Sequence, residues 1–93
     1  MIYTVTLELH SPEKNDALIR ESIKKFGRWA EPVRSTYLID VDIDADKLRD
    51  FFRPYLLAQD KVFVIEVTKR WSSYRLSKSV AVWLKQKTRS WPK

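Results

Sequence analysis

Polar and apolar residues alternate at the start of the chain. Apolar side chains occupy every second position across Ile2–Leu9, at Tyr3, Val5, Leu7 and Leu9. A period of two with β-branched residues predicts a strand. Ser11-Pro12 is expected to end it.

Three more segments are predicted to be strands. They are Arg28–Val33, Ser35–Ile43 and Lys61–Thr68. The first of them contains Pro32, which has no N–H to donate to a neighbouring strand, so this segment is expected only at the edge of a sheet.

Helical spacing separates these strands. Apolar residues recur every three to four positions across Asp16–Phe26, where Asn15 or Asp16 is expected to cap the start and Gly27 the end. A second helix is predicted from Asp44 to about Arg53, because Pro54 ends or kinks a helix.

The C-terminal part is predicted to hold a third helix. Residues 69–76 form a polar, aromatic-rich loop, after which Ser77 is expected to cap a helix that runs to about Lys87. Val80, Trp83 and Leu84 form its apolar face. Trp91-Pro92 is expected to be a frayed end.

The order of elements is β-α-β-β-α-β with an added C-terminal helix. This order predicts an α+β, ferredoxin-like βαββαβ sandwich, with helices on one face of the sheet. We expect residues 1–93 to form a single domain with a basic extension over 69–93. The predicted strand residues of the core are Tyr3, Val5, Leu7, Tyr37, Ile39, Val41, Phe63, Ile65 and Val67.

Charge is distributed unevenly along the chain. The net charge is +6, yet residues 1–66 hold ten Lys/Arg and twelve Asp/Glu, which gives −2, whereas residues 67–93 hold eight Lys/Arg and no acid, which gives +8. Such a segment suits a polyanion such as DNA or RNA. A solvated basic tail is the alternative interpretation.

Cations alternate with aromatic residues in this segment, a composition that suits phosphate contacts together with base stacking. At 100° per residue, three of the cations also fall on one line of the predicted helix, opposite its apolar face. The predicted nucleic-acid-binding residues are Lys69, Arg70, Trp71, Tyr74, Arg75, Lys78, Lys85 and Arg89. Packing of the aromatic residues in a core or interface is the alternative.

Several kinds of catalytic site are excluded by composition. The chain has no cysteine and only one glycine, which rules out thiolate metal sites and glycine-rich phosphate loops. The one histidine, His10, has no Ser/Asp or metal-ligand spacing around it and is interpreted as non-catalytic.

Strand parity places Glu8, Asp40 and Glu66 on the face away from the helices, with Glu8 at the opposite end of the sheet from the other two. They are therefore not expected to share one Mg²⁺ within a single chain.

The chain resembles a known family in several stretches. The first strand ending in a carboxylate, KKFG, STYLIDVDI, the D-x-x-K-L-R-D-F-F helix and DKVFVIEV are together similar to the small CRISPR-associated adaptation protein family. The similarity covers about residues 1–68. It is closest to the SinR-like relatives, and VapD-type ribonucleases are more distant.

This resemblance implies a homodimer that binds nucleic acid, with some members acting as metal-dependent nucleases. Glu8 occupies the position of the family's catalytic aspartate, and it would be the Mg²⁺ ligand if the protein were a nuclease. Three functions stay open: nucleic-acid binding, Mg²⁺-dependent cleavage through Glu8 at a dimer interface, and a protein-interaction module in a toxin system or an inhibitor. No membrane partner is expected, and the expected compartment is the cytoplasm.

Overall fold

Four strands form one antiparallel sheet in the computed structural model, which describes residues 1–91. The strands are β1 (Ile2–Glu8), β2 (Trp29–Val33), β3 (Thr36–Asp40) and β4 (Lys61–Glu66), in the spatial order β2-β3-β1-β4. The helices are α1 (Pro12–Lys24), α2 (Ala45–Phe52), the short 3₁₀ helix η1 (Arg53–Tyr55) and α3 (Lys78–Lys85). The predicted ferredoxin-like βαββαβ order with an added C-terminal helix is confirmed.

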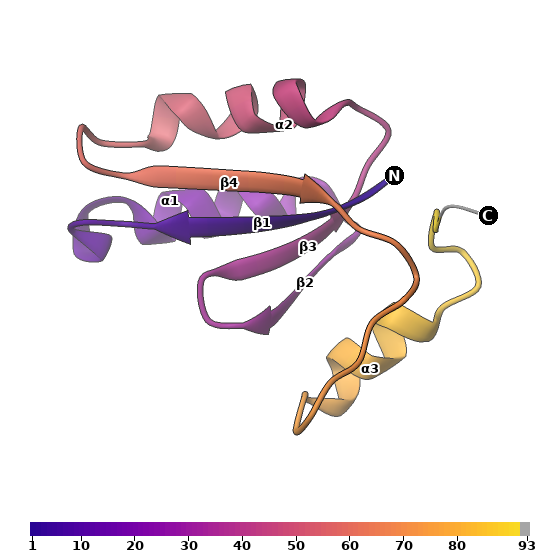
Figure 1. The fold of residues 1–93 in the computed structure, drawn as a ribbon. Helices are drawn as coiled ribbons and strands as arrows, with labels where there is room; N and C mark the ends of the chain where they lie inside the picture. The colour runs from indigo at the N-terminus through magenta and orange to yellow at the C-terminus, as the bar shows by residue number, and fades with distance from the viewer. Residues whose placement is uncertain (92–93) are drawn as a thin grey trace.

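The main core lies between the sheet and the helices α1 and α2 (Figure 1). Burial of one large apolar side chain stabilises a fold by roughly 1.5–3 kcal/mol, so this layer holds the domain together. Its buried residues are Tyr3, Val5, Leu7, Ile19, Ile23, Tyr37, Ile39, Leu48 and Phe52. The predicted inward faces of β1 and β3 are therefore confirmed.

The other face of the sheet is partly covered by α3. Val80 and Leu84 of this helix pack against Ile2, Ala30 and Leu38 in a second buried cluster. Figure 1 shows α3 apart from α1 and α2, next to β2 and β3. The sheet is consequently apolar on both faces, and the acid-free segment is folded back onto it.

The predicted orientation of β4 is wrong. Val64 lies opposite Val5, and Val62 lies opposite Leu7, so these two valines face α1 and α2. Phe63 and Ile65, which were expected in the core, lie on the other face and are 63% and 48% exposed. Both faces of this strand are apolar, so its own alternation does not reveal which face is buried.

The same register corrects the position of one carboxylate. Glu66 lies opposite Tyr3, on the face that carries α1 and α2. Asp40 lies opposite Ile2 on the other face, and Glu8 lies opposite Lys61 at the far end of β1. The three acids are thus not on one face, although Glu8 is at the opposite end of the sheet from the other two, as predicted.

The first helix starts four residues earlier than predicted. Ser11 is the N-cap residue, and Pro12 occupies the first turn, where a missing N–H breaks no helical hydrogen bond. Asn15, predicted as a cap, is buried inside the helix and donates to the Tyr55 carbonyl over 2.8 Å. Gly27 follows the helix with φ +76°, a conformation that glycine adopts without strain.

The other helix ends follow the predicted signals more closely. The Asp44 carboxylate accepts from the Lys47 N–H over 2.8 Å, and α2 gives way to η1 at Arg53, next to Pro54. Ser77 caps α3 by accepting from the Val80 N–H over 3.3 Å. The predicted extension of this helix to about Lys87 is wrong, because it ends at Lys85 and the chain then turns.

A buried carboxylate anchors the chain that follows α3. Asp40 accepts a hydrogen bond from the Ser90 N–H over 3.0 Å and a second from the Ser90 hydroxyl. The Arg89 guanidinium lies 3.7 Å from the same carboxylate. Trp91 packs on the second cluster and donates to the Leu84 carbonyl over 3.4 Å, so the frayed end predicted there is wrong for Trp91; Pro92 lies outside the described residues.

We predict that Asp40→Ala lowers the free energy of unfolding by about 2–3 kcal/mol, because it leaves the Ser90 N–H without its acceptor and the buried Arg89 guanidinium without its ion-pair partner. Asp40→Asn keeps one carbonyl acceptor and should cost less. Urea denaturation followed by circular dichroism measures both. Asp42→Ala, at an exposed neighbour, is the control; an equal loss in Asp40→Ala and Asp42→Ala would contradict the anchoring role.

Candidate functional site

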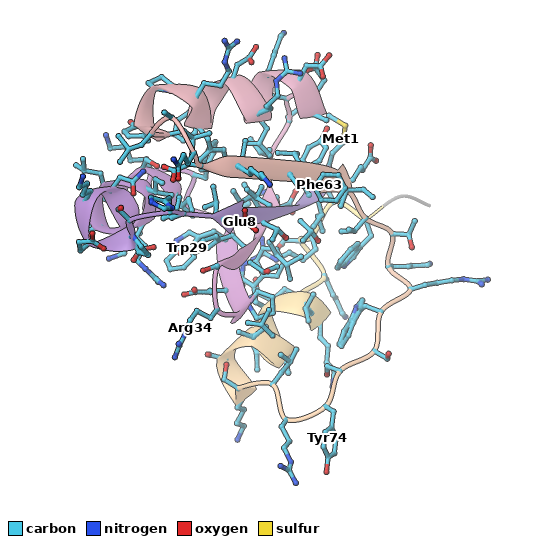
Figure 2. The ribbon with its side chains drawn as sticks, turned by 60° about the vertical axis from the view of Figure 1, so that its left-hand side comes forward. Met1, Glu8, Trp29, Arg34, Phe63 and Tyr74 are labelled. Carbon is cyan, nitrogen blue, oxygen red and sulfur yellow. The ribbon has the colours of Figure 1, made fainter. Side chains whose placement is uncertain are left out.

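The loop between β4 and α3 presents cations and aromatic rings to solvent. Lys69 and Arg70 are exposed, Trp71 is 38% exposed and Tyr74 is 81% exposed. Figure 2 shows Tyr74 at the tip of this loop, pointing away from the rest of the protein. An aromatic ring exposed to this degree adds little to the core and is accessible for stacking on a base.

Arg75 completes the tip of the loop. Its backbone has φ +63°, a left-handed conformation that costs energy for a residue with a side chain and that turns the chain toward α3. Its guanidinium lies 4.8 Å from the centre of the Tyr74 ring, within the range of a cation–π contact. The loop therefore places a cation directly beside its most exposed ring.

Helix α3 has a basic outer face. Val80 and Leu84 are buried against the sheet, whereas Lys78, Val82 and Lys85 are exposed. At 100° per residue the two lysines fall within about 20° of one line, opposite the buried pair. Two members of the predicted basic line, Lys78 and Lys85, thus lie on the outer face of α3, with Val82 between them.

Arg89 is not part of this exposed surface, although the sequence placed it there. Its side chain is only 7% exposed, lies next to Asp40 and stacks over the Trp83 ring at 4.1 Å. The physical reason is the end of α3 at Lys85, which turns Arg89 back toward the sheet. Lys87, which the sequence reasoning left out, is exposed instead.

The exposed cations of the segment lack acidic partners. Within residues 67–91, Arg89 is the one cation that forms an ion pair, and Lys69, Arg70, Arg75, Lys78, Lys85 and Lys87 form none. Several basic residues elsewhere are paired, such as Arg20 with Asp16 and Glu31. We define the basic surface as these six cations together with Trp71 and Tyr74.

Three comparisons with known proteins give no match for the chain. It matches no protein-family model, and neither a curated protein nor a solved structure is significantly similar to it. The established part of the family resemblance is therefore the small α+β fold with its four-stranded antiparallel sheet. Across residues 1–91, no helix has the length and apolar character needed to cross a bilayer.

Glu8 lies at the end of β1, opposite Lys61 at the start of β4. Its carboxylate is 3.5 Å from the Lys61 ammonium, and both side chains are largely exposed, so the pair is weak. No cluster of three or more potential metal-binding side chains is found among residues 1–91. In this part of the chain Glu8 is therefore paired with a cation and belongs to no such cluster.

The only histidine lies beside a structural carboxylate. The Asp60 carboxylate accepts from the His10 backbone N–H over 2.9 Å, from the Leu57 N–H over 2.8 Å and from the Asn15 amide over 2.8 Å. These hydrogen bonds favour the charged form and hold the pKa of Asp60 below its usual range. Asp60 thus fastens the loop before β4 to the end of β1.

We expect the stabilisation by Asp60 to depend on pH. A carboxylate whose pKa is depressed in the folded state stabilises the fold above its unfolded pKa of about 3.9, and this contribution disappears as the pH falls through the folded value. The loss of unfolding free energy in Asp60→Asn should therefore be larger near pH 7 than near pH 2. Urea denaturation of both proteins at the two pH values measures it, and a pH-independent difference would contradict the role.

Proposed function

We propose that this protein binds nucleic acid through the basic surface and acts as a homodimer. The observation that carries the proposal is the set of six exposed cations, unpaired within residues 67–91, next to two exposed aromatic rings. Cations attract phosphates by releasing their counterions, and rings stack on bases of any sequence. The chemistry favours contacts to the backbone and to unpaired bases over the reading of a specific sequence.

The position of this surface supports the same function. The α3 helix and residues 89–91 are held to the sheet by the second cluster and by Asp40. Lys78 and Lys85 consequently emerge from a fixed helix, and less conformational freedom is lost when they meet a ligand. We further propose a relation to the small CRISPR-associated adaptation protein family, supported by the shared βαββαβ order.

Cleavage of nucleic acid is not part of this proposal. Glu8 is paired with Lys61 and belongs to no cluster of three or more potential metal ligands within residues 1–91. The basic surface lies on the loop and α3 that follow β4, whereas Glu8 is at the end of β1 where β4 begins. We therefore propose that the protein binds nucleic acid without cleaving it.

The contribution of the cations to nucleic-acid affinity is tested with two double variants that have the same net charge. Lys69→Gln/Lys78→Gln removes two exposed cations of the basic surface, and Lys14→Gln/Lys25→Gln removes two exposed lysines at α1 on the other face of the sheet. We expect the first variant to bind labelled single-stranded DNA or RNA about ten-fold more weakly at low salt, with a salt slope smaller by about 1.5. The second should bind like the parent protein.

Fluorescence anisotropy at two salt concentrations measures these affinities. Binding that is absent at low salt, or equal weakening by both double variants, would contradict the proposed surface. Binding to an acidic protein instead of nucleic acid would favour the interaction-module function.

The aromatic contribution is tested separately. Because Tyr74 is 81% exposed and carries no core contact that would be lost, Tyr74→Ala should leave folding intact while removing a stacking platform. We expect about a ten-fold loss of affinity for single strands and little change for duplexes. Tyr74→Phe keeps the ring and should restore binding; equal losses in both variants would argue against stacking.

A further inference from the structure

Strand β4 has an open outer edge. It is the last strand of the sheet, with β1 on its inner side. The Val67 N–H donates to the Ile2 carbonyl over 3.0 Å, which fixes the odd-numbered residues as those bonded to β1. By the alternation of an antiparallel ladder, Val62, Val64 and Glu66 direct their N–H and C=O groups outward.

The two edges of the sheet differ in how well they are protected. The opposite edge strand, β2, contains Pro32 and an irregular register between Ala30 and Val33, both of which hinder pairing with another strand. β4 has no proline or irregularity, and it exposes Phe63 and Ile65 on one face. An unbroken edge next to exposed apolar side chains is suited to pairing with another strand.

We propose that β4 pairs antiparallel with β4 of a second copy of this chain, about a twofold axis at Val64. In this register all three outward-facing residues are used: Val64 pairs with its symmetry mate, and Val62 pairs with Glu66 in both directions. The strands then exchange about six hydrogen bonds. On the exposed face, Phe63 of each subunit lies opposite Ile65 of the other, so the apolar residues cover one another.

The charges near this edge also favour a second copy in the antiparallel orientation. β4 begins with Lys61 and ends with Glu66, so antiparallel pairing separates the like charges that parallel pairing would place side by side. Helix α3 packs on β2, at the opposite edge of the sheet, and Asp40 holds the chain at Ser90, so neither of these segments covers the β4 edge.

Helix α2 extends this complementarity. It packs on β4, and its Phe51 meets Phe26, which follows α1 in the chain, with ring centres 4.7 Å apart. The exposed flank of α2 lies away from its buried residues, Leu48 and Phe52. That flank carries a mixed ladder of ion pairs among Asp46, Arg49, Asp50 and Arg53. Two such ladders placed antiparallel set the acidic end of one helix beside the basic end of the other.

The proposed dimer also determines where Glu8 and the basic surface of each subunit lie. Each Glu8 lies beside its own Lys61, and the two Lys61 residues would be about 20 Å apart along the paired strands. The two Glu8 carboxylates are then too far apart to share a metal ion. The two basic surfaces start beyond Val67 at opposite ends of the paired strands, on the face that carries α3. The interface deepens the homodimer part of the proposed function and does not depend on nucleic-acid binding.

Single-cysteine variants test the register directly, because the chain has no cysteine of its own. In the proposed dimer the two Val64 Cα atoms are about 5.5 Å apart, within the range that a disulfide bridges. We expect Val64→Cys to form a covalent dimer under mild oxidation. Lys61→Cys, whose two copies are about 20 Å apart, is the matched control and should stay uncrosslinked.

Two exposed positions provide a test that does not disturb the core. A mixture of Phe63→Cys and Ile65→Cys should form mixed disulfide dimers faster than either variant forms a dimer with itself, since Phe63 lies opposite Ile65 of the partner. Self-crosslinking of Phe63→Cys alone would overturn the register. A sedimentation profile of a monomer at tens of micromolar would overturn the dimer.

A charge placed on the interface provides the solution test. Phe63→Lys should shift the parent dimer to monomer in sedimentation velocity, whereas Val82→Lys, an equally drastic change at the exposed face of α3, should not. Equal behaviour of the two variants would overturn the interface. Loss of nucleic-acid binding with intact Val64→Cys crosslinking would instead refute only the basic surface, so the two proposals fail separately.

Discussion

The packing of Val80 and Leu84 against Ile2, Ala30 and Leu38 is the contact on which the functional part of the structure depends. A segment with eight positive charges and no acid repels itself and has little reason to fold alone. Burial of two aliphatic side chains on the sheet gives it a fixed place. The hydrogen bonds from Ser90 to Asp40 then hold the chain beyond the helix.

This anchoring divides the basic residues into two groups. Arg89 forms an ion pair with Asp40 and stacks on the Trp83 ring, so its role is structural. The exposed cations on the loop and on the outer side of α3 form no ion pair within residues 67–91, so their charge is available to a partner. The same division applies to the aromatic residues, since Trp83 and Trp91 pack on the second cluster, whereas Tyr74 extends from the loop.

Local signals in the sequence were sufficient for most of the fold. Ser77, Asp44, Gly27 and Pro54 each act within one turn of the chain, and the structure uses each of them as expected. The face of β4 was not predictable in the same way, because valines, phenylalanine and isoleucine alternate along it and only its pairing with β1 decides which are buried. The role of Arg89 depends on Asp40, almost fifty residues away in sequence, which no local pattern reveals.

Mapping of the contact surface by NMR tests the central claim most directly. A short single-stranded oligonucleotide is added at low salt, and backbone amide and indole shifts are followed. We predict shifts across residues 69–87 and at the Trp71 indole, with little change at the Trp29 indole or along α1. Shifts confined to other parts of the chain, or none at all, would contradict the basic surface as the nucleic-acid site.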